Sequence, residues 1–136
     1  MAMGEAMMIA GVGCRRGTSA AAIETVIAAA LAHAGLTSHR IDLLATAAFK
    51  GDEPGIAAAA AARGVRLILV AQADLERAGD RATHSRRVAA LMGVGSVAEA
   101  AALAAGGPAA RLVVPRIVIG PATCALAQTA APEAAP

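Results

Sequence analysis

The stretch MMIAGVGCRRGT, residues 7–18, decides which fold the rest of the sequence can adopt. It begins as an apolar run of strand length, passes through glycines at positions 11, 13 and 17, and then opens onto an amphipathic helix. Because the apolar run is continuous, it predicts a strand over residues 7–12 that is buried on both faces. A buried strand, a tight glycine turn and a helix in this order are typical of an α/β domain.

Apolar runs and helix signals alternate along the rest of the chain. Ser, Thr or Pro residues precede the amphipathic stretches and Gly residues follow them, as at the starts and ends of helices. The predicted helices cover, in order, residues 18–34, 54–63, 74–77, 85–92 and 96–105. The predicted strands cover residues 7–12, 41–46, 66–71, 111–119 and 123–128, with residues 66–71 as the clearest buried strand. The polar residues 79–85 are expected to be mobile.

The order of these elements predicts a single domain over residues 7–128 with three layers, α/β/α. Strands that alternate with helices form a mostly parallel, mixed sheet, and the last two strands add a C-terminal antiparallel hairpin. Pro115 lies within the first strand of the hairpin, so we expect this strand to bend or to lie at an edge. We expect residues 1–6 to be a disordered leader and residues 129–136 a disordered tail.

Composition excludes several classes of function. The 136 residues include one Phe and no Trp or Tyr, so the chain lacks the stacking platform of single-stranded nucleic acid binders. A net charge of +2 is too small to predict nucleic acid binding. No apolar run reaches the roughly 18 residues that span a bilayer, and no signal peptide is recognised. We therefore expect a cytoplasmic protein that binds neither nucleic acid nor a membrane.

The two cysteines predict neither a disulfide nor a metal site. Cys14 and Cys124 lie far apart without metal-ligand spacing, so we expect free thiols in a reducing compartment. Neither a metal nor a cofactor is predicted.

Three loops are expected beyond the carboxyl ends of the strands, where α/β sheets bind their ligands. They span residues 11–18, 49–55 and 93–99, and they combine glycines, helix starts and fixed charges suited to an anionic group. The candidate binding residues are Gly11, Gly13, Cys14, Arg15, Arg16, Gly17, Thr18, Lys50, Asp52, Glu53, Ser96 and Glu99. The glycine spacing departs from the dinucleotide pattern, and no phosphate-loop lysine follows. The residues alone leave open whether the first loop cradles a ligand or is only a tight turn.

The same loops offer candidate catalytic groups, each with a structural alternative. Lys50 could bind an anion while Glu53 acts as acid or base, or both could belong to a solvated turn. Cys14 lies beside two arginines at a helix start, a setting that lowers a thiol pKa. It could be a nucleophile, a soft metal ligand or a small residue in a crowded turn. Ser96 and Glu99 form a capping box, which by itself explains a helix start.

Four segments taken together resemble a known family. They are residues 11–18 (GVGCRRGT), 50–55 (KGDEPG), 95–103 (GSVAEAAAL) and 123–127 (TCALA). Their order and spacing resemble the CobE / CbiG C-terminal domain family of cobalamin (vitamin B12) biosynthesis, over about residues 8–128. Arg116 stands where a lysine is expected in many CbiG-type relatives, a change that keeps the charge.

The resemblance implies an α/β domain that works on corrin-ring intermediates. It leads us to expect a cobalamin-pathway protein that binds a precorrin or corrinoid as a carrier or accessory factor, with other pathway enzymes as partners. Longer CbiG-type relatives open a ring lactone, and this chain is more similar to the stand-alone CobE branch. The alternatives are lactone hydrolysis, with Glu53 and Lys50 as candidate catalytic residues, and, more weakly, nucleotide-phosphate binding. Arg15 and Arg16 would meet the carboxylate fringe of the macrocycle.

Overall fold

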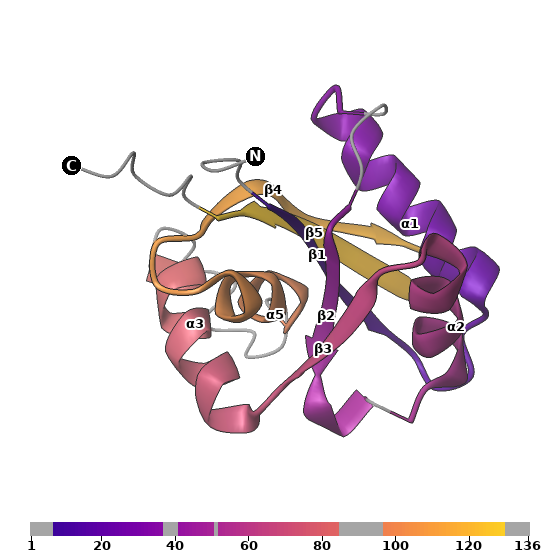
Figure 1. The fold of residues 1–136 in the computed structure, drawn as a ribbon, viewed down its shortest axis with the longest axis horizontal. Coiled ribbons are helices and arrows are strands. Elements are labelled where there is room, and N and C mark those ends of the chain that lie inside the picture. Colours follow the sequence, from indigo (N-terminus) through magenta and orange to yellow (C-terminus); the bar gives the residue numbers. More distant parts are fainter. Residues whose placement is uncertain (1–6, 37–40, 51, 85–96, 130–136) are drawn as a thin grey trace.

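A computed structural model describes residues 7–36, 41–50, 52–84 and 97–129. A twisted sheet of five strands lies between two pairs of helices (Figure 1). The elements are β1 (Met8–Cys14), α1 (Ala20–His33), β2 (Leu43–Ala47), the 3-10 helix η1 (Ala48–Lys50), α2 (Pro54–Arg63), β3 (Arg66–Val70), α3 (Gln72–His84), α5 (Val97–Gly106), β4 (Arg111–Ile119) and β5 (Ala122–Gln128). The predicted three-layer α/β fold is confirmed.

The sheet has the order β3-β2-β1-β5-β4, with β1 at its centre. β1 pairs in parallel with β2, and β2 pairs in parallel with β3. β5 is antiparallel to both β1 and β4, which confirms the predicted hairpin. Cys14 at the end of β1 pairs with Ala122 at the start of β5, so the β4–β5 turn lies at the carboxyl end of the parallel strands. The residues that follow β1 and β2, which belong to two of the three predicted loops, lie at this end.

Alternate side chains of β1 enter two separate cores. Met8, Ala10 and Val12 pack with α1 and α2, whereas Ile9 packs with α3 and α5. The predicted apolar stripe of α1 faces the first core, and five of its members are fully or almost fully buried: Ile23, Val26, Ile27, Ala30 and Leu31. A strand buried on both faces therefore carries a continuous apolar run, as predicted.

Two predicted helix boundaries around α1 are confirmed. Ser19, one of the two residues proposed as its cap, accepts a hydrogen bond from the N–H of Ala22 at 3.1 Å. Gly35 takes a positive φ of 71° after the last turn, and the N–H of Leu36 returns to the carbonyl of Leu31 at 2.8 Å. A left-handed glycine with this bond is a common way for a helix to end.

Helix α5 lies unusually close to β1 because β1 carries a glycine at the crossing point. A Cβ atom added to Gly11 would lie 2.0 Å from the carbonyl oxygen of Ala98 and 2.9 Å from the Cβ of Ala102. Only a residue without a side chain fits there. The alanine-rich face of α5 completes the contact, which explains why this helix needs few large side chains.

Two predictions about the middle of the chain are wrong. β3 was expected to be the clearest buried strand, yet it forms an edge of the sheet and leaves 49% of Leu69 exposed. Residues 74–77 were expected to be a short helix and residues 79–85 to be mobile. Instead α3 runs from Gln72 to His84, because Leu75 and Ala78 supply an apolar face that packs against α5. The helix predicted over residues 85–92 lies outside the described residues.

The structure describes both ends of the predicted domain but not the segments predicted to be a leader and most of a tail. Residues 1–6 and 130–136 lie outside the described residues. Thr129 forms two hydrogen bonds with Met7: its N–H donates to the Met7 carbonyl at 3.0 Å, and its Oγ1 accepts from the Met7 N–H at 2.8 Å. These bonds extend the pairing of β1 with β5 by one residue. No helix in the described part of the chain has the length and apolar character that crossing a membrane would need.

Candidate functional site

The loop that follows β1 is fixed by its own backbone and by one buried threonine. Thr18 is 7% exposed, and both its hydroxyl and its N–H donate to the carbonyl of Arg15, at 2.6 and 3.2 Å. Gly17 takes a φ of 79°, which a residue with a side chain rarely adopts. Arg15 and Arg16 are exposed on the outside of this turn. The turn therefore holds its backbone rigidly while it presents two cations to solvent.

The turn between β2 and α2 packs directly against this loop. A Cβ atom on Gly55 would lie 2.1 Å from the carbonyl oxygen of Thr18, so only glycine allows the two segments to approach this closely. The Gly17 N–H donates to Oε1 of Glu53 at 3.0 Å. Oε2 of the same carboxylate lies 3.8 Å from Nζ of Lys50. Two loops far apart in the sequence thus meet at the carboxyl end of the sheet, as predicted.

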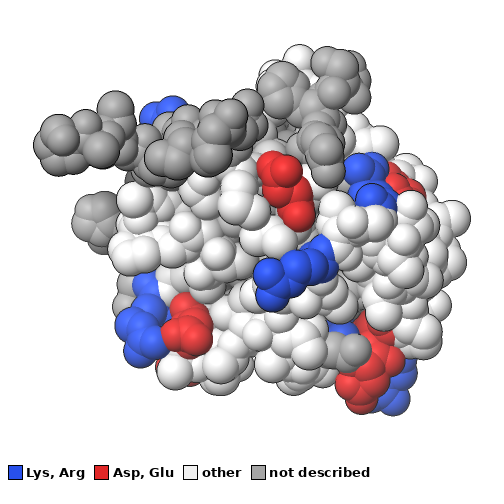
Figure 2. Space-filling model, in the orientation of Figure 1, with Lys and Arg blue, Asp and Glu red and all other residues white. Residues whose placement is uncertain are grey.

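An open cavity of about 520 Å³ lies at this junction. Its lining residues are Arg16, Gly17, Phe49, Lys50, Asp52, Glu53 and Pro54. Five of these seven are binding residues that the sequence predicts. Figure 2 shows charged side chains of both signs at the lower right, over the segment between β2 and α2, and further red and blue groups at the lower left, the centre and the upper right of this face.

The cations around the cavity differ in how they are engaged. The side chains of Lys50 and Glu53 are 24% and 13% exposed, and they form an ion pair with each other. Within the described ranges, no carboxylate pairs with Arg15 or Arg16. A guanidinium without a protein partner can bind a carboxylate through two parallel hydrogen bonds. The rim therefore offers fixed cations to an anionic ligand.

Cys14 lies at the end of β1 and does not have the lowered pKa that the sequence predicts. Burial raises the pKa of its thiol above the ordinary value, and the nearby carboxylate of Glu53 raises it further. A hydrogen bond with Thr18 and the charge of Lys50 act in the opposite direction but do not outweigh burial. The thiol is therefore protonated at neutral pH, which favours a packing role over a nucleophilic one.

Gly11 and Gly13 serve the packing of the sheet and do not line the cavity. Gly11 is covered by α5, as described above. A Cβ atom on Gly13 would lie 3.0 Å from Oγ1 of Thr123, and this hydroxyl donates to the Gly13 carbonyl at 3.3 Å. The two alternatives left open by the sequence therefore apply to different residues. Gly11 and Gly13 allow close packing, while Gly17 presents its N–H at the cavity.

The third predicted loop is described only from the start of its helix. Ser96 lies outside the described residues, and α5 begins at Val97, one residue before the Ala98 carbonyl that lies against Gly11 in the middle of β1. Glu99 is 1% exposed, and its Oε2 accepts a hydrogen bond from the backbone N–H of Arg116 at 2.9 Å. This contact joins the first turn of α5 to β4. Glu99 is not among the residues that line the cavity.

Sequence reasoning missed Phe49 as a residue of the site. It is the only aromatic residue in the chain, it is 65% exposed, and it lines the cavity beside Lys50. Leu69, Val118 and Ile119, near the carboxyl ends of β3 and β4, are also exposed. Four of the five large apolar side chains exposed among the described residues therefore lie near this end of the sheet. The signal in the sequence was the position of Phe49 next to Lys50, three residues after the predicted strand 41–46.

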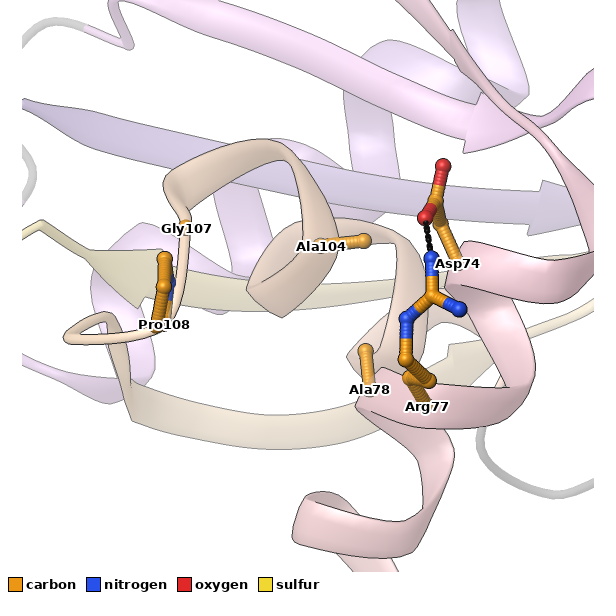
Figure 3. A pocket seen from close by; sticks show the side chains of 6 residues that line it. All are labelled: Asp74, Arg77, Ala78, Ala104, Gly107 and Pro108. Atoms are coloured by element: carbon orange, nitrogen blue, oxygen red, sulfur yellow. Dashed lines mark hydrogen bonds and ion pairs between the residues drawn. The ribbon is translucent and has the colours of Figure 1, made fainter.

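A second cavity of about 400 Å³ lies between α3 and the end of α5 (Figure 3). Asp74 and Arg77, on consecutive turns of α3, form an ion pair with each other. The remaining lining residues are small or lack a polar side chain: Ala78, Ala104, Gly107 and Pro108. None of the predicted site residues lines this cavity.

Comparison with known proteins identifies the family. A family model described as "Cobalamin synthesis G C-terminus" matches residues 8–127. The protein CobE of a Sinorhizobium species is 38% identical over 121 residues, which cover 88% of this chain and 79% of that protein.

Two solved structures resemble this chain along nearly its whole length. One is the cobalamin biosynthesis protein chiG of Agrobacterium tumefaciens, with 42% identity, a TM-score of 0.72, and coverage of 90% of this chain and 98% of that chain. The other is CobE, a protein from the cobalamin biosynthetic pathway, with 30% identity, a TM-score of 0.78 and coverage of 94% of each chain. This chain is therefore a cobalamin biosynthesis protein of the CobE / CbiG C-terminal family.

Proposed function

We propose that this protein binds a precorrin or corrinoid intermediate at the cavity between residues 14–19 and 49–55. The single observation that carries this proposal is an exposed aromatic ring, Phe49, beside cations from both loops. Precorrins are flat macrocycles with apolar faces and a fringe of acetate and propionate carboxylates. An aromatic side chain suits the face of such a ring, and Arg or Lys suits its fringe.

The cavity supports contact with one edge of the pigment and not its complete enclosure. A volume of about 520 Å³ is within the usual range for small-molecule pockets but leaves much of a macrocycle outside. The exposed apolar side chains Val118 and Ile119 lie near the same end of the sheet. The N–H of Arg15 donates to the carbonyl of Pro121 at 2.9 Å, which brings the β4–β5 turn beside the first loop. This turn gives the pigment a further apolar surface.

We propose a carrier or accessory role in corrin ring synthesis, in which the protein holds the pigment and passes it to other enzymes of the pathway. Both oxygens of Glu53 already contact donors of the chain itself, Gly17 and Lys50, and the thiol of Cys14 is protonated at neutral pH. Neither arrangement favours base or nucleophilic catalysis. Cys14 and Cys124 are free thiols, which supports a cytoplasmic location.

Gel filtration with hydrogenobyrinic acid tests the proposal. The pigment is expected to elute with the protein, and its visible absorbance reports the complex because the polypeptide itself absorbs no visible light. ATP and NAD are expected to leave the melting temperature unchanged. A pigment that elutes entirely apart from the protein would contradict the proposed function, and turnover of a lactone-bearing precorrin would favour the enzymatic alternative.

A further inference from the structure

We infer that the carboxylate of Glu53 occupies the place that a carboxylate of the ligand takes on binding. The incoming carboxylate displaces Glu53 from two donors, the Gly17 N–H and the Lys50 ammonium group. The inference rests on the proposed function only in requiring a ligand that carries carboxylates. Glu53 thus competes with the ligand. Removing its charge should raise the affinity for the ligand, whereas removing a ligand contact would lower the affinity and removing a catalytic base would lower activity.

The geometry shows that a carboxylate is already recognised in this cavity. Oε1 of Glu53 accepts from the Gly17 N–H at 3.0 Å, and Oε2 lies 3.8 Å from Nζ of Lys50. The two donors come from different loops and converge on one carboxylate, and all three residues line the cavity. A propionate or acetate group that reached the same position would find the Gly17 N–H at hydrogen-bond distance and the Lys50 ammonium group at ion-pair distance.

The Glu53 contacts can be released without unfolding α2. Glu53 is the N-cap residue of this helix, yet its side chain makes no capping hydrogen bond. The start of the helix is held instead by Gly55, which packs on the Thr18 carbonyl, and by Ile56, which is fully buried. The separation of 3.8 Å from Lys50 is also longer than the roughly 2.7–2.9 Å of a strong charge-assisted hydrogen bond. The ion pair is therefore loose enough for exchange.

Asp52 provides a matched control on the same turn. It lines the same cavity, is exposed, and forms no hydrogen bond or ion pair with any described residue. Asp52→Asn and Glu53→Gln each remove one negative charge from the cavity. Only Glu53→Gln also removes the charge that competes for Gly17 and Lys50. A difference between the two variants therefore reports displacement and not a general change in charge.

The experiment titrates wild type, Glu53→Gln and Asp52→Asn with two probes. One probe is hydrogenobyrinic acid, and the other is mellitate, a flat benzene ring with six carboxylates. Glu53→Gln is expected to tighten binding of both probes about fivefold, the order expected when one partly exposed ion pair no longer competes, and Asp52→Asn less than about twofold. Thermal melting shows whether each variant is folded, and Glu53→Ala, which is expected to tighten binding as well, replaces Glu53→Gln if that variant is not.

Each outcome decides between the two proposals. If wild type binds hydrogenobyrinic acid and Glu53→Gln binds it equally or more weakly, the inference is overturned while the proposed function stands. Equal tightening by Asp52→Asn also overturns the inference. If mellitate binding tightens in Glu53→Gln but hydrogenobyrinic acid binds to no variant, the inference stands and the proposed function fails. If neither probe binds to any variant, both proposals fail.

Discussion

Two cavities among the described residues, one at the loops and one between α3 and α5, are similar in size but differ in how their charged side chains are paired. Between α3 and α5, Asp74 and Arg77 lie three residues apart on one helix and neutralise each other (Figure 3). At the carboxyl end of the sheet, the charges come from two loops, and Arg16 has no partner carboxylate among the described residues. A cavity alone therefore does not indicate a site. A cavity is a better candidate for a binding site when loops distant in the sequence meet there and some of their charged side chains have no partner.

The two cavities also differ in the size and exposure of the apolar side chains that line them. The cavity between the helices is lined by small residues that belong to ordinary helix packing, such as Ala78 and Ala104. The cavity at the loops exposes 65% of a phenylalanine to solvent. Phe49 is one of four large apolar side chains exposed near this end of the sheet, and exposed apolar side chains that gather in this way mark binding sites more often than single ones do. The comparison therefore favours the loops over the helices as the site of the ligand that we propose.

The largest expected effect comes from the glycine that holds the two loops together. Gly55→Ala should destabilise the protein by about 3 kcal/mol, because its Cβ would lie 2.1 Å from the Thr18 carbonyl oxygen. Gly107→Ala, at the other cavity, should cost only about 1 kcal/mol. No other part of the molecule lies within 4 Å of the added Cβ, so the loss comes only from placing a residue with a side chain at a φ of 92°. Urea unfolding measures both. Equal losses would show that the loops are not held by this contact.

The second effect tests whether water is excluded from the core around Cys124, below the loops. Burial raises the pKa of Cys124 from 9.0 to about 12, so the native state keeps a proton that the unfolded state loses above pH 9. Stability should therefore fall as the pH rises from 9 towards 12, with roughly 1 kcal/mol lost by pH 10 from this residue. Urea unfolding of wild type and Cys124→Ala at pH 8 and pH 10 measures the difference. Parallel losses in both proteins would contradict the assignment.

The third effect tests the aromatic contact. Phe49→Ala should weaken corrinoid binding about fivefold, because one aromatic contact contributes roughly 1 kcal/mol beyond its buried area. Leu69→Ala removes another exposed apolar side chain, which does not line the cavity, and should leave binding unchanged. Titrations followed by the visible spectrum of the pigment compare the two variants. Equal weakening would indicate a diffuse apolar surface without a specific contact to Phe49.

The smallest effect compares one arginine from each cavity. Arg16→Ala should weaken corrinoid binding about threefold, the order of one solvent-exposed ion pair. Arg77→Ala should leave the affinity unchanged because its guanidinium pairs with Asp74. The same titration at low and high salt should show a weaker salt dependence for Arg16→Ala than for wild type. If Arg77→Ala weakened binding as much, the distinction between the two cavities would be lost.

The sequence predicts most of the fold because most of the relevant signals are local. Glycines after helices and the apolar runs of β1, β4 and β5 place these elements within two residues of their observed bounds. The position of β3 could not be predicted, since an apolar run does not reveal which strand lies outermost. The length of α3 was missed because its apolar face depends on contact with α5, which lies beyond residue 96.

The site residues that could be predicted from the sequence are glycines and charged residues in the predicted loops. Gly17, Lys50 and Glu53 could be chosen on these grounds, and the structure brings them together. The close approach of Gly11 to α5 spans almost ninety residues of sequence, so its packing role could not be seen. Burial likewise reverses the expected pKa shift of Cys14, and burial is a tertiary property. Phe49 was missed because a lone aromatic residue is usually part of a core.

The most direct test of where the ligand binds follows one backbone amide from each cavity. Hydrogenobyrinic acid is titrated into ¹⁵N-labelled wild-type protein while the NMR signals of Gly17 and Gly107 are recorded. Binding at the loops predicts that the Gly17 amide signal moves with saturation, as its N–H exchanges Glu53 for the ligand, while the Gly107 signal stays in place. A shift of Gly107 with an unmoved Gly17 would contradict this assignment of the site.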